Sequence, residues 1–204
     1  MLFSLEETNQ PQKTDPVYVD ASAFGNWQAA FVQGNSLEAM RAHFEHLHLG
    51  DSCEFATGGR WSFHEMILYF LGRLGRCEVA LTTWAISENP VRALVMAKEA
   101  GLISRLDVLL DLRIRNNQGE ALALLLKQAD SHRLTKIHAK VCALVGEKSG
   151  ASILTSANLT VNKRIEAGTV RLSRESALLH QSWIKKEIEH GTLIGKSGTT
   201  WEND

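Results

Sequence analysis

Four polar side chains in the second half of the chain have the types and the spacing needed to hold a phosphate group. His138 and Lys140 are two residues apart, and so are Ser156 and Asn158. Residues two apart project from the same face of a strand, so on two neighbouring strands all four could point toward one place. An imidazole nucleophile, an ammonium and two neutral donors suit the binding of a phosphate and the stabilisation of its negative charge. The spacing therefore predicts a phosphate-binding site.

Strands must position these residues, and the β-branched and apolar runs of the sequence predict five of them. The predicted strands cover about 78–86, 105–114, 135–145, 151–157 and 166–172. A turn at residues 146–150 joins the third strand to the fourth, which together form the hairpin that carries both polar pairs. His138 and Lys140 are thus expected within a strand.

Helices alternate with the first strands. Capping-box patterns and turn residues predict helices from about 35 to 48, from 62, from 89 to 101 and from 117, with a last amphipathic helix at 173–190. Two helices therefore precede the first clear strand. Alternating strands and helices imply parallel pairing, so the expected fold is α/β, with a mixed, mostly parallel sheet flanked by helices.

Length and composition indicate one domain with short tails. A chain of 204 residues, 44% hydrophobic and 22% charged, can form the single core of an ordinary globular protein. Residues 1–35 are polar and are expected to form an N-terminal arm. Residues 36–191 are expected to form the domain, with two leading helices, and residues 192–204 a flexible tail.

The sequence carries no sign of export or membrane insertion. Its start lacks the basic region of a secretory signal, and no stretch approaches the roughly 18 apolar residues that span a bilayer. Cys53, Cys77 and Cys142 are widely spaced, which suits reduced thiols better than a disulfide framework. The expected compartment is the cytoplasm, and no membrane partner is expected.

The formal net charge of -1 conceals an uneven distribution. Residues 1–58 hold 2 Lys/Arg against 8 Asp/Glu, whereas residues 131–190 hold 10 against 5. Nucleic-acid binding depends on local positive potential, because affinity arises from the release of counterions condensed on phosphates. The basic half is therefore the expected phosphate-facing side, although a solvated surface without a partner would have the same charge pattern.

The order of these polar residues resembles the phospholipase D superfamily. The signature of that family is H-x-K, then a strand and a turn, then G-S-x-N, and an acidic residue a short distance on. Here it reads H-A-K at 138–140, T-S-A-N at 155–158 and Glu166. The resemblance is close over this region and loose over about 60–190, while the first 50 residues have no counterpart.

The resemblance implies a phosphodiesterase that needs neither a metal nor another cofactor. His138 would attack phosphorus and form a phosphohistidine intermediate, which water then hydrolyses. Lys140 and Asn158 would hold the non-bridging oxygens, and Ser156 would hydrogen-bond within the phosphate pocket. Glu166 would accept a hydrogen bond from the other ring nitrogen of His138 and fix its tautomer.

Two positions depart from the family pattern. Val145 occupies the place of the usual aspartate in H-x-K-x4-D, and Thr155 replaces the glycine before the serine. Residue 145 differs from 138 by an odd number, so on a regular strand its side chain faces away from His138. The aspartate would then be structural, a valine can fill apolar space, and Glu147 is a candidate substitute. Thr155 could change how closely the backbone approaches the phosphate.

A single H-x-K motif implies a homodimer. No other histidine has a lysine two residues on, and the chemistry of the family uses one histidine as nucleophile and a second as general acid. Short one-motif members of the family are typically nucleases, so a nuclease that cleaves DNA or RNA is favoured over a phospholipase. The alternative is a catalytically degenerate module that binds nucleic acid or protein.

Three other candidates have less support. A group of possible metal ligands precedes the first predicted strand, namely His43, His46, His48 and Cys53. This group lacks a second ligand pair at a defined spacing, so a solvated helix explains it more simply. Trp84 could stack a base at the end of its strand or belong to the core. Cys142 shares the strand parity of His138, but a small buried residue is the simpler interpretation.

Overall fold

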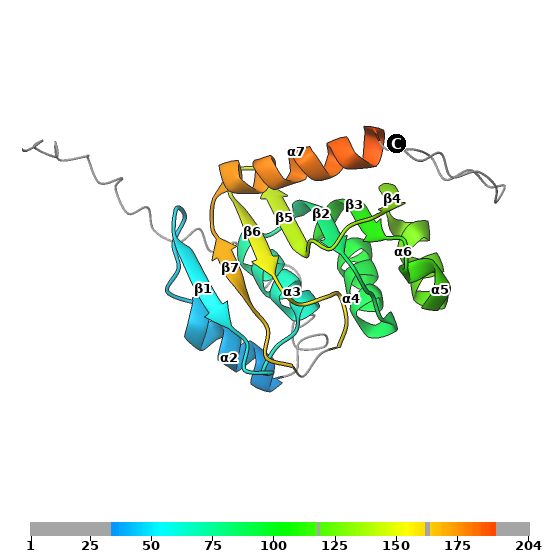
Figure 1. Cartoon of the computed structure of the whole chain (residues 1–204). Helices are drawn as coiled ribbons and strands as arrows, with labels where there is room; N and C mark the ends of the chain where they lie inside the picture. The colour runs from blue at the N-terminus through cyan, green and yellow to red at the C-terminus, as the bar shows by residue number, and fades with distance from the viewer. Residues whose placement is uncertain (1–33, 118, 162–163, 191–204) are drawn as a thin grey trace, which may run out of the picture.

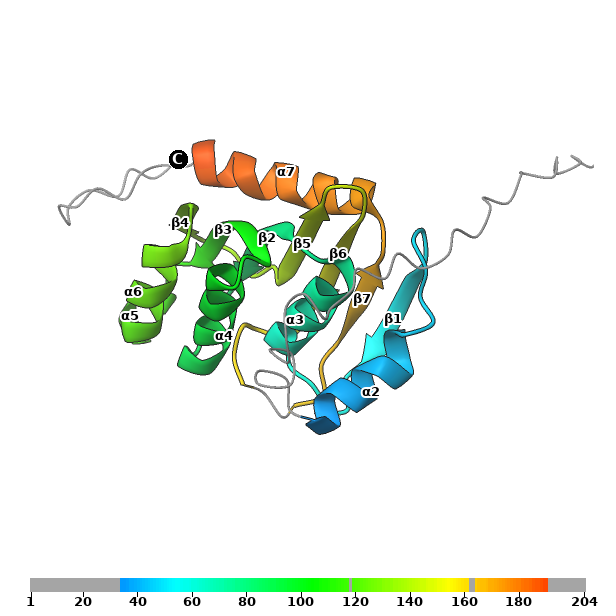
Figure 2. The same cartoon turned by 180° about the vertical axis from the view of Figure 1, so that it is seen from behind.

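A computed structural model describes residues 34–117, 119–161 and 164–190 (Figures 1 and 2). Its elements are α2 Gly34–Phe44, β1 Ser52–Ala56, α3 Phe63–Leu74, β2 Cys77–Thr83, α4 Glu88–Glu99, β3 Ile103–Asp111, α5 Ile114–Asn117, α6 Gly119–Gln128, β4 Ser131–Thr135, β5 Val141–Gly146, β6 Gly150–Thr155, β7 Ala167–Arg171 and α7 Arg174–His190. The predicted tail at 192–204, and the predicted N-terminal arm up to residue 33, lie outside the described residues. None of the described helices is long and apolar enough to cross a membrane.

The strands of the described residues form one mixed sheet in the order β1-β7-β6-β5-β2-β3-β4 (Figure 1). The expected α/β fold with a mixed sheet is confirmed. The expectation of mostly parallel pairing is wrong, because only β2–β3 and β3–β4 are parallel and the other neighbours are antiparallel. The short turn from β5 to β6 permits only an antiparallel pair, since a parallel pair needs a long crossover.

Both edge strands were missed by the prediction from sequence. β1 pairs only with β7, and β4 pairs only with β3. Phe55 is the one buried residue of β1, and β4 has none. Because β1 precedes α3, a strand separates the two leading helices. An edge strand is covered less than an inner strand and so lacks a continuous apolar run that could reveal it.

Only the second half of the strand predicted at 135–145 forms a strand, because residues 136–140 connect β4 to β5. β4 ends at Thr135 and β5 begins at Val141. The two strands lie on opposite sides of the β3–β2 pair, so the segment between them must pass across the ends of β3 and β2. His138 and Lys140 lie in this connecting segment, and their expected place within a strand is therefore wrong.

Helices cover both faces of the sheet. α3 and α4 pack on one face, with α2 beside α3 and α6 beside α4, whereas α7 packs on the opposite face (Figures 1 and 2). Every residue of β5 is buried, as expected for a strand covered on both faces. Cys142 and Leu144 belong to the core on the side of α3 and α4, while Val145 packs with Ala177 and Ile184 of α7. The prediction that Val145 faces the other side of its strand is thus confirmed.

Candidate active site

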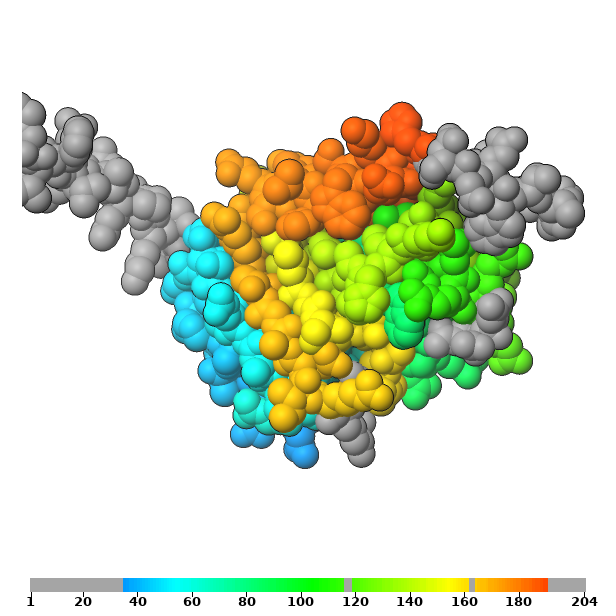
Figure 3. Space-filling view, in the orientation of Figure 1, coloured from blue at the N-terminus to red at the C-terminus, as the bar shows by residue number. Residues whose placement is uncertain are grey.

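The residues of the sequence motif meet because several chain segments reach one edge of the sheet, the edge that is formed by strand ends and not by an outer strand. The end of β6 lies beside the starts of β5 and β7, with Leu154 opposite Val141 and Thr155 opposite Gly168. β2 ends beside the start of β5, with Thr82 opposite Val141, and β3 runs parallel to β2. Figure 3 shows the chain after β6 and before β7, yellow to orange, at the surface below α7. Side chains from these segments therefore share one exposed edge.

His138 and Lys140 lie at this edge immediately before β5. Lys140 Nζ is 2.8 Å from the carbonyl oxygen of His138 and 3.2 Å from each nitrogen of its ring. His138 is exposed, whereas Lys140 is 7% exposed. Burial lowers the pKa of the Lys140 ammonium, and the negative charges of Glu166 and Asp111 partly oppose that shift. An exposed imidazole and a mostly buried cation therefore stand side by side.

Two buried threonines at the end of β2 hold the motif segments in place. The Thr82 hydroxyl donates to Ala139 O at 3.0 Å and accepts from Val141 N at 3.1 Å. The Thr83 hydroxyl accepts from Leu159 N at 3.0 Å. Buried hydrogen bonds of this kind are not exposed to competition from water. One threonine thereby fixes the segment that carries H-A-K, and the next fixes the segment that follows β6.

Ser156 and Glu166 are joined directly where β6 and β7 meet. The Ser156 hydroxyl donates to a carboxylate oxygen of Glu166 and accepts from Ala167 N at 3.1 Å. Thr57 holds the backbone of Glu166, since its hydroxyl accepts from Glu166 N at 3.0 Å and its own N–H donates to Glu166 O at 2.7 Å. Glu166 therefore lies at the site with its carboxylate on Ser156. The predicted hydrogen bond from His138 to this carboxylate stays a prediction.

The Asn158 side chain lies half-buried just beyond β6. Its Oδ1 is buried and has no hydrogen-bond partner among the described residues. Buried polar atoms are normally hydrogen-bonded, so such an atom requires an explanation. Half a turn of the amide would exchange Oδ1 for two N–H donors, which suits an oxygen of a bound phosphate. The surroundings of Asn158 are therefore compatible with a phosphate donor.

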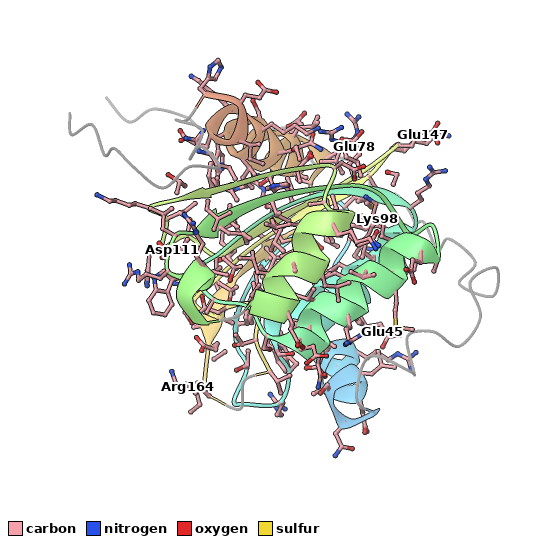
Figure 4. The ribbon with its side chains drawn as sticks, turned by 90° about the vertical axis from the view of Figure 1, so that its right-hand side faces the viewer. Glu45, Glu78, Lys98, Asp111, Glu147 and Arg164 are labelled. Carbon is pink, nitrogen blue, oxygen red and sulfur yellow. The ribbon has the colours of Figure 1, made fainter. Side chains whose placement is uncertain are left out.

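The positions that depart from the family pattern have different surroundings. Val145 fills apolar space under α7. Glu147 lies in the turn after β5, and Figure 4 shows it on the opposite side of the molecule from Asp111, which ends β3 at the site. Glu147 therefore does not reach the site, and its role as a substitute for a structural aspartate stays a prediction. Thr155 is the last residue of β6, and its hydroxyl accepts at 3.1 Å from the backbone N–H two residues on.

Three more residues surround the site at the ends of β2 and β3. Trp84, predicted either to stack a base or to belong to the core, is half-buried. Its ring meets the His138 ring edge to face, with the ring centroids 5.7 Å apart. Asp111 is buried and accepts from Ile137 N at 3.2 Å. Arg113 lies over the Trp84 ring. Sequence reasoning missed Asp111 and Arg113, although their place at the end of a strand was a usable signal, since ligands of open α/β sheets bind there.

The other sequence candidates have simple structural surroundings. Cys53 Sγ lies 3.7 Å from His43 Nε2. No group of three or more histidine, cysteine or acidic side chains within the described ranges could hold a metal ion. Cys142 is fully buried in the core, and burial raises the pKa of its thiol. None of these contacts supplies a further reactive group to the site.

Solved structures with a similar backbone connect this geometry to a known fold. Nuc from Salmonella typhimurium, a phospholipase D family member, matches with a TM-score of 0.51 and 16% sequence identity, over 70% of this chain and 97% of that one. The chain has the phospholipase D fold. NucT from Helicobacter pylori matches with a TM-score of 0.49 and 15% identity, over 68% of this chain and 97% of that one.

A third solved structure matches over only part of its own length. Polyphosphate kinase from Porphyromonas gingivalis has a TM-score of 0.47 and 16% identity, over 72% of this chain and 27% of that one. No family model matches the sequence, and no curated protein matches it either. The resemblance that H-A-K and T-S-A-N suggested is thus confirmed at the level of the fold.

Proposed function

We propose that the protein is a metal-independent phosphodiesterase with His138 as its nucleophile. The observation that carries the proposal is the contact of the Lys140 ammonium with His138 at the sheet edge where the T-S-A-N segment and Glu166 also lie. A fixed cation and amide donors can stabilise the charge of a phosphoryl transition state in the manner of a metal ion. The phospholipase D fold supports the same chemistry.

The first step replaces an alcohol on phosphorus with an imidazole nitrogen. A lone pair of the His138 ring forms the P–N bond while the bond from phosphorus to the leaving oxygen breaks, which gives a phosphohistidine intermediate. Lys140 and Asn158 bind the non-bridging oxygens, and Ser156 hydrogen-bonds within the same pocket. Glu166 accepts from the other ring nitrogen of His138 and stabilises the imidazolium as it forms.

The leaving oxygen needs a proton, and the chain has one H-x-K motif. We therefore assign the general acid to a second copy of the chain, so that in a homodimer His138 of the partner subunit protonates the leaving oxygen. In the second step water attacks phosphorus, the P–N bond breaks, and His138 of the partner subunit takes the proton of the water. Both histidines return to their starting states, so the reaction is hydrolysis.

A nucleic acid is the proposed substrate because of the charge of the segment that carries the motif. Residues 131–190 hold 10 Lys/Arg against 5 Asp/Glu, and a polyphosphate chain binds to such a segment by releasing counterions. The similarity of the fold to Nuc, over nearly the whole of that chain, supports a compact one-motif nuclease. DNA is the first substrate to test, and RNA the second.

The second candidate is a module with the same fold that binds nucleic acid or protein without turnover. The observation that favours it is Val145, which stands where the family has an aspartate and packs against α7. If catalysis in the family requires that aspartate, its loss would abolish turnover while the apolar packing of Val145 keeps the fold intact.

The test is cleavage of a labelled DNA oligonucleotide in excess chelator by the wild type, by His138→Ala and by His132→Ala. His132 is an exposed histidine of β4 and controls for the loss of any imidazole. We expect the wild type and His132→Ala to cleave, and His138→Ala to be inactive. Tight binding without cleavage by all three proteins would support the binding module instead.

A further inference from the structure

A stack of side chains next to His138 has no part in the proposed reaction. The Arg113 guanidinium lies over the Trp84 ring, with Cζ 4.8 Å from the ring centroid. The same indole meets the His138 ring edge to face, with the centroids 5.7 Å apart. One aromatic ring therefore connects an arginine to the imidazole that attacks phosphorus.

Asp111 holds this guanidinium by its inner nitrogen. Arg113 Nε and the backbone N–H of Arg113 both donate to Asp111 Oδ1 at 3.0 Å. The other carboxylate oxygen accepts from Ile137 N at 3.2 Å, next to the H-A-K motif. The Asp111 side chain is 4% exposed, whereas that of Arg113 is 68% exposed. The carboxylate thus orients a guanidinium whose two terminal nitrogens have no hydrogen-bond partner among the described residues.

Trp84 provides a stacking surface for the arginine. The indole Nε1 is buried and has no hydrogen-bond partner within the described part of the chain. Buried indole nitrogens usually find an acceptor, so the position of this ring is not explained by a hydrogen bond. A planar guanidinium stacks well on an aromatic face, and the stack leaves its outer edge free to bind.

We infer that Arg113 binds a second phosphate of the substrate, adjacent to the one that His138 attacks. The inference rests on the proposed function and names the feature that selects a polynucleotide over an isolated diester. The outer edge of a guanidinium presents parallel N–H donors that match two oxygens of a phosphate. A base stacked on this face of Trp84 is excluded by the guanidinium that already covers it.

The experiment compares two substrates that differ in their number of phosphates. The value of kcat/KM is measured for a single-stranded DNA oligonucleotide and for bis(4-nitrophenyl) phosphate, with the wild type, Arg113→Gln and Arg115→Gln. Arg115 is an exposed arginine of α5, so its loss removes the same charge two residues away. The kcat/KM for the oligonucleotide, divided by that for bis(4-nitrophenyl) phosphate, should fall about tenfold in Arg113→Gln. It should be unchanged in Arg115→Gln, and Arg113→Lys should recover part of it.

The dependence of oligonucleotide binding on salt gives a second readout. Loss of one phosphate contact should reduce the slope of log K against log salt by about 0.7 in Arg113→Gln and leave it unchanged in Arg115→Gln. Equal losses on both substrates, or equal effects in the two Gln variants, would overturn the role of Arg113 and leave the proposed function standing. If the wild type cleaves neither substrate, the proposed function fails, and the salt slope alone still decides whether Arg113 binds phosphate.

Discussion

His64 and His138 each have a serine and a glutamate close by, yet the two sets differ in what they can do. Around His64 the set is closed, because the Ser62 hydroxyl donates to Glu65 Oε2 at 2.8 Å and lies 2.8 Å from His64 Nδ1. Ser62 N donates to the same carboxylate oxygen at 2.7 Å. All three residues are buried at the start of α3, and burial lowers the pKa of His64 to about 4.

Around His138 the set is assembled from separate segments and stays open. Ser156 and the imidazole are exposed at the sheet edge, and the neighbouring Lys140 supplies a charge. The first set is a capping box, whose polar groups satisfy one another and the first turn of a helix. The second is accessible from outside the protein, because His138 and Ser156 are exposed. The comparison shows that residue types alone do not define a site, and that exposure of the polar side chains is the better criterion.

The largest effect is expected from exchanging the two histidines for alanine. His138→Ala should lower kcat/KM by at least about 10³-fold and leave the free energy of unfolding unchanged, because it removes an exposed nucleophile. His64→Ala should retain turnover and lose about 1–3 kcal/mol of stability, because a buried hydrogen bond and its packing are lost. Steady-state kinetics and urea unfolding of both variants check this. A rate loss of similar size in both would erase the distinction.

Lys140 provides the next largest effect and a dependence on pH. Lys140→Ala should lower kcat/KM about 10²-fold, since the ammonium stabilises the phosphoryl charge. Only the protonated amine can do so. Because burial lowers the pKa of this amine from its usual 10.5, activity should be lost, as the pH rises, at a pH below 10.5. Lys140→Arg should move this loss to higher pH, because a guanidinium does not titrate there.

The pH profiles of Lys140→Arg and Lys136→Arg test the assignment. Lys136 is an exposed lysine of the same connecting segment, so its replacement controls for a change of basic group. The alkaline loss should move only in the Lys140 variant. An alkaline limb that stays at the same pH in Lys140→Arg would show that another group controls it.

A smaller effect, of about tenfold or more on kcat, is expected for Glu166→Gln. If this carboxylate orients His138, the variant should keep KM and lose rate, since the amide stabilises the imidazolium less well. Glu65→Gln should keep both constants and lower stability through the capping box. The separation of kcat from KM in the two variants is the measurement. An unchanged kcat in Glu166→Gln would mean that this residue serves only Ser156.

The smallest effect on rate is expected at Val145. Val145→Asp should give no gain in kcat, because the side chain faces α7 and not the site. It should destabilise the fold by about 2 kcal/mol or more, since a carboxylate would be buried without a partner. Val145→Thr, which has nearly the same shape, provides the control for the loss of stability. A large gain in activity for Val145→Asp would show that the natural protein is catalytically degraded.

The inner elements could be predicted because short stretches of the sequence carry their signals, such as a continuous apolar run or a capping-box pattern. The run VCALVG reads as a covered strand and forms β5, and the Ser62–Glu65 pattern begins α3 with the hydrogen bond from Ser62 N to Glu65 that a capping box requires. The edge strands SCEFA and SHRLT could not be predicted from the sequence, because an edge strand needs little apolar content.

The motif residues of the candidate site could be predicted from the sequence, but the residues that hold them in place could be predicted only in part. H-A-K and T-S-A-N could be paired in advance, because antiparallel neighbours bring the start of one strand to the end of the next. The end of a strand was a signal for Asp111 as a site residue, but the hydrogen bonds that Thr82 and Asp111 make depend on which strands are neighbours across the whole sheet. Their local sequence does not encode that pairing.

The central claim, a covalent intermediate on His138, is tested most directly by the stereochemistry at phosphorus. A DNA substrate with a phosphorothioate of one known configuration at the scissile position is cleaved in isotopically labelled water and excess chelator. Two successive in-line displacements, the first by histidine and the second by water, predict retention of configuration in the product. Inversion would mean a single direct attack by water, and would contradict the role of His138 as nucleophile.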